Sequence, residues 1–518
     1  MFHLPSNLYA QDTWLKVFGG ANADIGMSVV TAPDGGIVVA GISQSTGGVL
    51  NLTNSGSDDI FVVKLDKRGD VLWRRCFGGF GIDTVTSIAT TLNGGYILTG
   101  HTTSDPGFGC GRYWDIIVLL LDGQGNVQWN RCYGGSGMDQ AHSIVTTSDG
   151  WIIAGLTRSI DDLFKTNRRS WEDAACFRIN RNGEVMWSIT FGVQDFADAV
   201  FGSALAAELD GVFVVGYTPH WPFSGEVNAA ANMFAILLDA DGREVWSARI
   251  GGSYADIGTA ATATTDGGFV VAGYSYSHVT DDSVKSRGEE DVILTKLDRN
   301  GNIVWKTVLG GTRSERPRSI AATADGGVIV TGYTRSMDMS FDQRTRRDME
   351  AFAARYTSDG TRVWIRCFGG LNSDDSRSIA MMPDGGFVVT GMTLSTDGDF
   401  QGTNMGKGDM FVGRFDSNGQ LSPTSDVADS PLASTTLAVY PNPVLESAVI
   451  SAAFDRDEHA RVEIVNVLGQ HVETILDRYQ TAGSLDIPFD MSTLPAGPYS
   501  VRIVSDSKAI STVFVVSR

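Results

Sequence analysis

The stretch that decides the fold is the segment Lys64–Trp73, KLDKRGDVLW, because it returns as KLDRNGNIVW at residues Lys296–Trp305. The tryptophan that ends this segment recurs along most of the chain. Its positions are 14, 73, 129, 187, 246, 305 and 364, which are separated by 59, 56, 58, 59, 59 and 59 residues. Self-similarity at such a regular period predicts a repeat architecture.

Each repeat contains four short apolar stretches separated by turns. In the repeat that spans residues 319–370, the stretches are four to seven residues long, rich in Val, Ile and Phe, and bounded by Gly or Asp. This pattern is typical of strands, and we name the strands a, b, c and d in chain order. Short glycine turns join a to b (Asp34–Gly36) and c to d (Asp66–Gly69), as antiparallel hairpins require. Four-stranded meanders at this period predict the blades of an all-β propeller.

The number of repeats predicts seven blades. Seven glycine-rich a–b turns lie near residues 35, 94, 150, 211, 267, 326 and 385, and the last a–b–c set, 378–415, has no following Trp. The chain begins instead with a d strand, Trp14–Phe18. We therefore predict that the N-terminal strand completes the seventh blade and closes the ring, since an open ring would leave unpaired strand edges. The predicted propeller spans residues 12–420.

Length and charge limit the classes of function. The chain has 518 residues and a formal net charge of −20, which argues against a nucleic acid partner because phosphate binding needs a clustered basic surface. No apolar run approaches the roughly 18 to 20 residues that span a bilayer, so no transmembrane segment is predicted. Residues 1–11, MFHLPSNLYAQ, resemble the end of a signal peptide and are interpreted as a residual signal segment.

The recurring tryptophans and cysteines are interpreted as structural. A large ring at one repeat position predicts that each Trp packs between adjacent blades as an apolar filler. The five cysteines are an odd and sparse set, and Cys76, Cys132 and Cys367 occupy one equivalent repeat position. We therefore expect small buried hydrophobic side chains at these positions and no disulfide framework.

The pattern Lys-Leu-Asp-x-x-Gly-x-x-x-Trp at residues 64–73 and 296–305 resembles the repeats of quinoprotein and kelch-like propellers. It is most similar to the β-propeller repeats of bacterial surface proteins. The resemblance covers residues 12–420 and implies the fold rather than a ligand. A pyrroloquinoline-quinone enzyme is not favoured, because those families carry a calcium-bound cofactor cluster that has no counterpart in this sequence. We predict no cofactor.

After Gln420 the composition changes, and residues 421–436, rich in Ser, Thr, Pro and Asp, form a predicted linker. Residues 437–518 contain YPNP at 440–443, VEIVNVLGQ at 462–470 and LPAGPYSV at 494–501, before the terminal FVVSR. Alternating apolar residues in these segments predict a small Ig-like β-sandwich. In order and place, the segments resemble the type A sorting domain of the type IX secretion system. The resemblance implies contact with that secretion machinery and a secreted or outer-surface location in a Gram-negative bacterium.

The predicted strand directions place all long connections on one face. Because the a–b and c–d turns are tight, they share one face, the turn face, whereas the d–a and b–c connections share the opposite face, the loop face. The b–c loops run about 15 to 18 residues, longer than connection requires, which favours a functional role. One acid precedes each a strand. These acids together form a carboxylate ring at the channel mouth, or each of them anchors its own turn, and their recurrence in every repeat favours the second interpretation. These acids are Asp24, Asp83, Asp139, Asp198, Asp256, Glu315 and Asp374.

Departures from the repeat are better candidates for a ligand site. Three residues after the acid, His142, Arg318 and Arg377 stand where other repeats have residues such as Met27 and Thr86. They either line the channel mouth and hold an anionic group or form salt bridges with neighbouring acids. Aromatic and basic b–c loop residues suit glycan or peptide recognition, and they equally suit packing within their own loops. These further candidates are Trp114, Arg168, Arg169, Trp171, Tyr217, His220, Trp221 and Phe223.

Metal and catalytic motifs are sparse. Asp397 and Asp399 have the oxygen spacing of a calcium loop, but the closing Glu is missing, so the pattern matches such a loop only in part. The sequence contains no nucleophile elbow, zinc motif or Walker loop. Its 60 acidic residues leave a carboxylate-pair glycosidase open.

The preferred interpretation is a non-enzymatic binding or adhesion protein, secreted or surface-displayed, whose loop face recognises a glycan or a surface protein. The alternative is a secreted glycan-active hydrolase or lyase with acids at the channel mouth. Polar residues that converge asymmetrically over the pore with shifted pKa values would favour an enzyme. An aromatic patch off the axis would favour a binder. A structural stalk without a ligand is a third interpretation.

Overall fold

The computed structural model describes most of the chain. The described residues are 13–48, 57–104, 110, 114–164, 172–191, 199–220, 227–251, 255–276, 288–337, 349–400, 406–421, 437–440, 447–454, 458–466, 470–480, 483–490, 494–505 and 509–516. Their elements are strands and three short 3-10 helices, so the all-β prediction is confirmed. Within this described part, no helix has the length and apolar character needed to cross a membrane. The chain divides into two compact units, Met1–Thr424 and Ser425–Arg518, which are described separately.

The first unit is built from four-stranded antiparallel sheets, seven of which lie within the described residues. Six of them follow one another along the chain. They are β2 (Asp24–Thr31), β3 (Ile37–Ser43), β4 (Asp59–Leu65) and β5 (Val71–Phe77); β6 (Asp83–Thr90), β7 (Tyr96–Thr102), β8 (Asp115–Leu121) and β9 (Val127–Tyr133); β10 (Asp139–Thr146), β11 (Gly150–Thr157), β12 (Asp173–Asn180) and β13 (Val185–Phe191); β14 (Ala199–Ala206), β15 (Gly211–His220), β16 (Val227–Leu238) and β17 (Glu244–Ile250); β18 (Asp256–Ala263), β19 (Phe269–Ser275), β20 (Asp291–Leu297) and β21 (Ile303–Leu309); β22 (Glu315–Ala322), β23 (Val328–Thr334), β24 (Glu350–Tyr356) and β25 (Arg362–Phe368). The 3-10 helices are η1 (Asp162–Phe164), η2 (Ala207–Leu209) and η3 (Gly398–Phe400).

The remaining sheet contains strands from both ends of the unit. It consists of β26 (Asp374–Met381), β27 (Phe387–Thr393), β28 (Asp409–Phe415) and β1 (Trp14–Phe18), with β1 beside β28. Trp14 lies opposite Arg414, and Phe18 lies opposite Met410. Both aromatic side chains are buried in a core cluster that also includes Met410. The N-terminal strand is therefore an integral part of this sheet.

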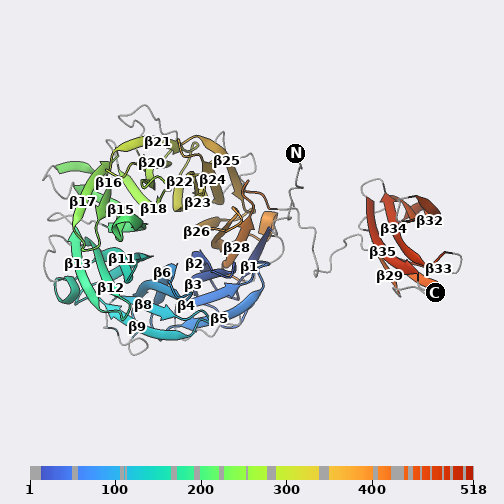
Figure 1. The fold of residues 1–518 in the computed structure, drawn as a ribbon, viewed down its shortest axis with the longest axis horizontal. Helices are drawn as coiled ribbons and strands as arrows, with labels where there is room; N and C mark the ends of the chain where they lie inside the picture. The colour runs from blue at the N-terminus through green and yellow to red at the C-terminus, as the bar shows by residue number, and fades with distance from the viewer. Residues whose placement is uncertain are drawn as a thin grey trace, which may run out of the picture. The chain divides into compact units, whose positions relative to one another are not determined.

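The sheets lie around a central opening, with their first strands innermost, in a propeller-like arrangement (Figure 1). Serine hydroxyls connect neighbouring inner strands, because each accepts a hydrogen bond from a backbone amide of the next strand. The pairs are Ile88 N to Ser28 Oγ, Ile144 N to Ser87 Oγ, Ile379 N to Ser319 Oγ and Val29 N to Ser378 Oγ, at 3.1–3.3 Å. The last pair joins β26 to β2.

The recurring Trp packs against the next sheet, as the sequence predicts. Trp14 Nε1 donates to the backbone oxygen of Lys67 at 2.9 Å, in the c–d turn of that sheet. Gly69 in this turn has a φ of 80°, and a Cβ atom there would lie 2.8 Å from the Trp14 ring. Glycine adopts this backbone conformation without strain and leaves room for the ring. The same contact between a Trp ring and a turn glycine is made by Trp73, Trp187, Trp246, Trp305 and Trp364.

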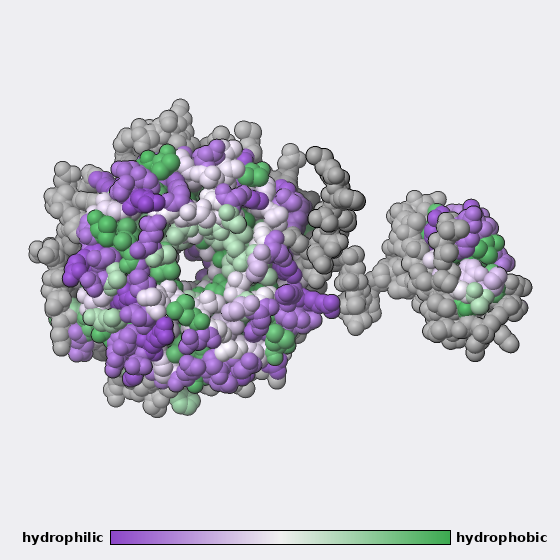
Figure 2. Space-filling view, viewed as in Figure 1, coloured by the Kyte–Doolittle hydropathy of each residue, from purple (hydrophilic) through white to green (hydrophobic). Residues whose placement is uncertain are grey.

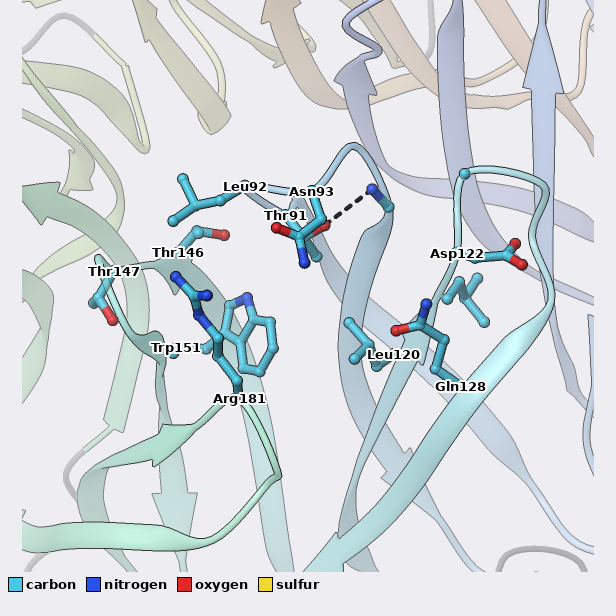
Figure 3. A pocket seen from close by; sticks show the side chains of 14 residues that line it. Thr91, Leu92, Asn93, Leu120, Asp122, Gln128, Thr146, Thr147, Trp151 and Arg181 are labelled. Carbon is cyan, nitrogen blue, oxygen red and sulfur yellow. Dashed lines mark hydrogen bonds between the residues drawn. The ribbon is translucent and has the colours of Figure 1, made fainter.

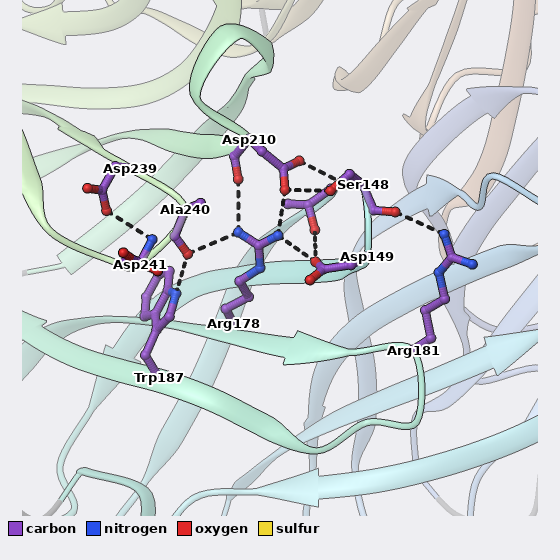
Figure 4. Close-up of polar contacts among 10 residues, drawn as sticks. Ser148, Asp149, Arg178, Arg181, Trp187, Asp210, Asp239, Ala240 and Asp241 are labelled. Carbon is purple, nitrogen blue, oxygen red and sulfur yellow. Dashed lines mark hydrogen bonds and ion pairs between the residues drawn. The ribbon is translucent and has the colours of Figure 1, made fainter.

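The turn face carries a second repeated contact, an ion pair between the c strand and the a–b turn. Arg178 of β12 extends this contact to the next sheet (Figure 4). Its guanidinium side chain is only 3% exposed and bonds to Asp149, to Asp210 at 2.6 Å and to the backbone oxygen of Ala240 at 3.0 Å. One buried cation thus ties β12 to the sheet of β14–β17. The simpler pairs are Lys64–Asp34, Lys296–Asp266, Arg355–Asp325 and Arg414–Asp384, at 2.5–2.7 Å.

The structure corrects the expectation for one cysteine. Cys132 of β9 is not a free hydrophobic side chain but forms a disulfide with Cys110, with their Cα atoms 5.5 Å apart. Cys110 lies in a b–c loop outside the regular repeat, so the alignment of repeats gives no sign of this partner. Cys76 and Cys367, at the position equivalent to Cys132, are not cross-linked by a disulfide.

The second unit contains two antiparallel sheets. One is formed by β29 (Leu437–Tyr440), β30 (Ser447–Phe454) and β33 (Gly483–Asp490), and the other by β31 (Glu458–Asn466), β32 (His471–Gln480), β34 (Gly497–Ser505) and β35 (Ala509–Val516). Ile450 from the first sheet and Val462 and Ile464 from the second belong to one buried cluster. Two sheets packed around a shared core form a β-sandwich.

Candidate ligand site in the central channel

A β-bulge interrupts the innermost strand of each described sheet at the same place. In β2, Gly26 pairs with Gly41 and Ser28 pairs with Ala40, so Met27 is an extra residue outside the ladder. Bulges re-aim a side chain and are common next to functional sites. The extra residues of the seven sheets are Met27, Thr86, His142, Phe201, Thr259, Arg318 and Arg377.

These bulge residues all line one cavity of about 270 Å³. Ile257, Tyr274, Arg316 and Pro317 complete its wall. Figure 2 shows the opening at the centre of the ring from one face. Each sheet thus contributes one bulge side chain, and the chemistry of the cavity depends on which residue each bulge carries.

One side of the cavity is basic. Arg318 Nη2 lies 3.3 Å from Asp375 Oδ2, and Arg377 Nε lies 3.4 Å from the same oxygen. The Asp375 side chain is 2% exposed, so two guanidinium groups share one buried carboxylate. Burial lowers the pKa of Arg377, and the charge of Arg318 adds to this effect while Asp375 opposes it.

Tyrosine rings and Glu290 fix the orientation of the remaining arginine on this side. Arg316 donates to both carboxylate oxygens of Glu290, at 2.5 and 2.6 Å. Its guanidinium group lies 4.6 Å from the centre of the Tyr274 ring. A hydrogen bond with Glu290, together with burial, raises the pKa of Tyr276 to about 12. Arginine between a carboxylate and an aromatic face is held by charge and by cation–π attraction.

The other side of the cavity is aromatic. The His142 ring lies 5.0 Å from Phe201, and Phe201 stacks 5.8 Å from Tyr217. The Nε2 atom of His142 is buried, and the described residues provide it with no hydrogen-bond partner. Burial lowers the pKa of His142 to about 4, so the ring is neutral at pH 7.

His101 and Trp114 extend the aromatic side toward the b–c loop of the second sheet. Their rings stack with centroids 4.6 Å apart. Burial, and then the charge of His142, lowers the pKa of His101 to about 3. Cys110 lies in the same loop, and its disulfide with Cys132 attaches this loop to β9.

The acids that precede the inner strands are held within their own turns. Asp24 accepts hydrogen bonds from the Gly20 amide, from Ser43 and from Ser45. Equivalent bonds hold Asp83, Asp139, Glu315 and Asp374, and each of these five acids is at most 1% exposed. The interpretation as a carboxylate ring at the channel mouth is therefore wrong for these five acids. Asp198 lies outside the described residues.

The structure brings together five of the residues singled out from the sequence. Trp114, His142, Tyr217, Arg318 and Arg377 lie in or beside the cavity, with His101 and Phe201 as connecting rings. His220 ends β15, and its side chain is outside the described part. The candidates Arg168, Arg169, Trp171, Trp221 and Phe223 lie outside the described residues, and their roles stay predictions.

Four residues of the site were missed by the sequence analysis. Phe201 stands three residues after Asp198, which is the same position relative to the acid as that of His142, so the sequence could have indicated it. His101, Tyr274 and Arg316 have no comparable signal, because their positions in the repeat are not otherwise distinctive. They belong to the site only through contacts between strands and sheets.

Asp397 and Asp399 hold backbone amides. Asp397 Oδ1 accepts from Leu371 N at 2.8 Å, and Asp399 Oδ2 accepts from Gly369 N at 3.0 Å. In the described ranges, no three His, Cys, Asp or Glu side chains are grouped so that they could hold a metal ion. Calcium binding by these two acids stays a prediction.

Two further cavities open beside the tight turns. One, of about 190 Å³, is lined in part by Leu92, Trp151 and Arg181 (Figure 3). The other, of about 410 Å³, includes Leu209, at the end of η2 where other sheets have a glycine turn. Arg181 already donates to the backbone oxygen of Ser148 at 2.9 Å. The central cavity is the stronger candidate for a ligand site, because two arginines in its wall, Arg318 and Arg377, share the single carboxylate of Asp375.

Comparison with known proteins identifies the C-terminal part. Residues 438–517 match the family model of the secretion system C-terminal sorting domain, which confirms the sorting domain expected from the sequence. A type IX sorting domain implies a bacterial protein that is secreted or held on the outer surface. Regulatory protein FlaEY of Caulobacter vibrioides is 24% identical over 265 residues, which are 47% of this chain and 27% of that protein. An uncharacterized WD repeat-containing protein of Acanthamoeba polyphaga mimivirus is 20% identical over 473 residues, and the match covers 68% of this chain and 34% of that protein.

The chain thus spans about a third or less of the length of these curated relatives. Among solved structures, a puromycin hydrolase aligns with a TM-score of 0.44 at 11% identity, over 85% of this chain and 58% of that one. A putative 6-phosphogluconolactonase of Bacteroides fragilis aligns with a TM-score of 0.40 at 9% identity, over 78% of this chain and 98% of that one. Likeness at this level carries no argument about activity.

Proposed function

We propose that this chain is a binding or adhesion protein of the outer surface of a Gram-negative bacterium. Its seven sheets are the blades of a propeller closed by β1, its loop face recognises a glycan or a surface protein, and its C-terminal domain engages the type IX secretion machinery. The observation that carries the binding function is the convergence of His142, Arg318 and Arg377, three departures from the repeat, on one cavity.

Contacts at the junction of the two chain ends support the closed ring. Five consecutive residues of β1 pair with β28. Ser378 of β26 accepts the amide of Val29 in β2, which is the contact that other neighbouring inner strands also make. Both the outer and the inner part of this junction therefore use interactions found elsewhere in the ring.

The composition of the cavity wall supports recognition of a polar ligand with an apolar face. Aromatic rings offer flat apolar area, and arginine offers a planar fork of donors. Here Phe201 and Tyr274 stand near Arg318 and Arg377 around one opening. Sugars and peptides both combine such polar and apolar surfaces.

A glycan and polysaccharide array, probed with the full chain, tests this function. Binding that Arg318→Gln or Tyr217→Ala weakens, and that Arg243→Gln leaves unchanged, is expected. Arg243 is the matched control because its side chain is 74% exposed and pairs with Asp241 beside a tight turn. Silence of the folded chain on the array and on intact bacterial cells would contradict a binding function.

A secreted glycan-active hydrolase or lyase is the second candidate, and the asymmetric convergence of His142 and Arg377, both with lowered pKa values, on the central cavity favours it. A neutral His can accept a proton, and a neighbouring arginine can stabilise the negative charge that develops on the substrate. Incubation of the chain with bound polysaccharides, followed by absorbance of unsaturated products, tests this activity. Product that His142→Ala abolishes would establish a lyase, whereas intact polysaccharide would leave the binding function alone.

A further inference from the structure

The charges around the central cavity do not balance. Among the described residues, its wall includes Arg316, Arg318 and Arg377 and no acidic side chain. Glu290 neutralises Arg316 through two hydrogen bonds. Within the part of the chain that the structure describes, Arg318 and Arg377 share one carboxylate, that of Asp375. This excess of positive charge stands in a protein whose formal net charge is −20.

The two arginines are also poorly satisfied as donors. Arg318 reaches Asp375 at 3.3–3.4 Å, longer than the roughly 2.7–2.9 Å of a strong charge-assisted bond. The Nε atom of Arg377 is buried and, although Asp375 Oδ2 lies 3.4 Å away, it forms no hydrogen bond within the described part of the chain. Nη1 of Arg377 has the thioether sulfur of Met27 at 3.6 Å, which is a weak acceptor.

Buried guanidinium donors without good acceptors are costly, because burial removes the water that would otherwise solvate them. The lowered pKa of Arg377 expresses the same cost. A negatively charged ligand oxygen would offset this cost in two ways, because it would accept a hydrogen bond from the guanidinium group and neutralise its charge. The exposed part of Arg318, 37% of its side chain, leaves this arginine accessible to such a ligand.

We propose that the central cavity is a subsite for one anionic group, a carboxylate or sulfate, on an acidic polysaccharide, with Arg318 and Arg377 as its donors. This inference rests on the proposed function and names its ligand class. The cavity of about 270 Å³ lies below the roughly 300–1,000 Å³ of pockets that enclose a drug-sized ligand. It therefore suits a single charged group, while the rest of the chain lies across the loop face.

The aromatic side of the cavity complements this group. Phe201 gives an apolar wall against which the ring of a sugar can pack. Nε2 of His142 is buried and, within the described residues, has no hydrogen-bond partner, so it is available for one hydrogen bond with a ligand hydroxyl. A saccharide that bears a carboxylate or a sulfate offers both features, whereas a free inorganic anion offers only the charge.

Titration calorimetry of the full chain tests the subsite with matched oligosaccharides. The ligands are uronate-bearing, sulfated and neutral oligosaccharides of equal length, together with inorganic sulfate. We expect the acidic saccharides to bind at least about tenfold more tightly than the neutral ones, since a charge-assisted bond contributes about that factor. Comparison of the uronate and sulfate arms identifies the anionic group, and inorganic sulfate measures the contribution of charge alone.

Variants separate the subsite from the rest of the binding face. Arg318→Gln and Arg377→Gln are each expected to remove about tenfold or more of the affinity for the acidic ligand. Arg243→Gln is the control, because it removes the same charge from an exposed side chain beside a tight turn and outside the cavity wall. Thermal unfolding checks that the variants fold. If Arg377→Gln does not fold, Arg318→Gln still tests the subsite, because Arg318 is partly exposed and its replacement is expected to leave the fold intact.

Three results would overturn the inference. Equal binding of acidic and neutral saccharides would show that the loop face binds glycans without an anionic subsite, and the proposed function would stand. Acidic binding that Arg318→Gln leaves unchanged would place the anion elsewhere. Failure of every saccharide, with a surface protein bound instead, would overturn the ligand class and keep a binding protein.

Discussion

The turn face and the central cavity use cationic side chains in opposite ways. On the turn face, Lys64 and Lys296 each have a carboxylate of their own, at 2.5 and 2.7 Å. In the cavity, Arg318 and Arg377 share Asp375 at 3.3–3.4 Å. The first arrangement repeats from sheet to sheet, and the second occurs where the repeat is broken. Repetition therefore marks the scaffold of this molecule, and departure from the repeat marks the proposed site.

The carboxylates differ between the same two regions. The hydrogen bond from Lys64 lowers the pKa of Asp34 on the turn face. Burial raises the pKa of Asp374, in the turn that precedes β26, to about 6. Asp34 therefore stabilises the fold when it is ionised, whereas Asp374 stabilises it when it is protonated.

Removal of β1 is expected to have the largest effect on stability, because it removes part of the repeated scaffold. Trp14 and Phe18 are buried, and truncation of such a side chain costs about 3–5 kcal/mol. Deletion of residues 12–20 should therefore remove most of the stability of a typical domain, about 5–15 kcal/mol. Thermal unfolding followed by tryptophan fluorescence measures this loss. A propeller transition at the wild-type temperature would contradict both ring closure and the role of β1.

Replacement of the buried cation of the turn face should have the next largest effect. Arg178→Met leaves the carboxylates of Asp149 and Asp210 without their cationic partner and removes the Arg178 donor from the backbone oxygen of Ala240, which keeps its bond from Trp187. Since both acids are partly exposed, we expect a loss of about 3 kcal/mol, the low end for a broken buried pair. Urea unfolding measures it against Arg243→Met, an exposed pair for which we expect about 0–1 kcal/mol. Equal losses in the two variants would remove the distinction between buried and exposed pairs on this face.

The pH dependence of stability should separate the two kinds of acid. Because the pKa of Asp374 rises from 3.8 to about 6 on folding, its contribution is complete below pH 3.8 and is lost as the pH rises through about 6. We expect Asp374→Asn to remove about 2 kcal/mol of this dependence between pH 4 and 7. Asp34→Asn should act in the opposite sense, because an acid with a lowered pKa loses its contribution as the pH falls. Urea unfolding at a series of pH values measures both, and parallel profiles for wild type and Asp374→Asn would refute the assignment.

Substitution in the cavity should change stability least. Arg318 is 37% exposed, its bonds to Asp375 are long, and its guanidinium group lies 5.3 Å from the centre of the Tyr333 ring. We expect Arg318→Gln to change the free energy of unfolding by less than about 1 kcal/mol, as for an exposed ion pair. Urea unfolding in the absence of ligand checks this. A loss as large as that of Arg178→Met would show that Arg318 is scaffold rather than site.

The sequence predicts the repeated part of this molecule well, because a repeated contact leaves a repeated residue. The Trp at each d strand and the glycine of each c–d turn are visible in the sequence for the same reason that they touch in space. The sequence also reveals His142, Arg318 and Arg377, because they differ from the residues that other repeats have at the same position, three residues after the acid. Arg316, Tyr274 and His101 are not, since packing between sheets rather than position brings them to the cavity. The partner of Cys132 is hidden because Cys110 lies in a loop of irregular length.

The bulges have a consequence for how this molecule can change. A bulge residue takes no part in the ladder, so its identity is not fixed by the pairing of the first two strands. Thr86 and Thr259 are partly tied, because their hydroxyls donate to the backbone oxygens of Ala141 and Pro317. The other five positions surround the opening, and each can be altered by one codon. Evolution, or a combinatorial library, can therefore change the side chains that line the channel while the remaining strand residues keep their sequence.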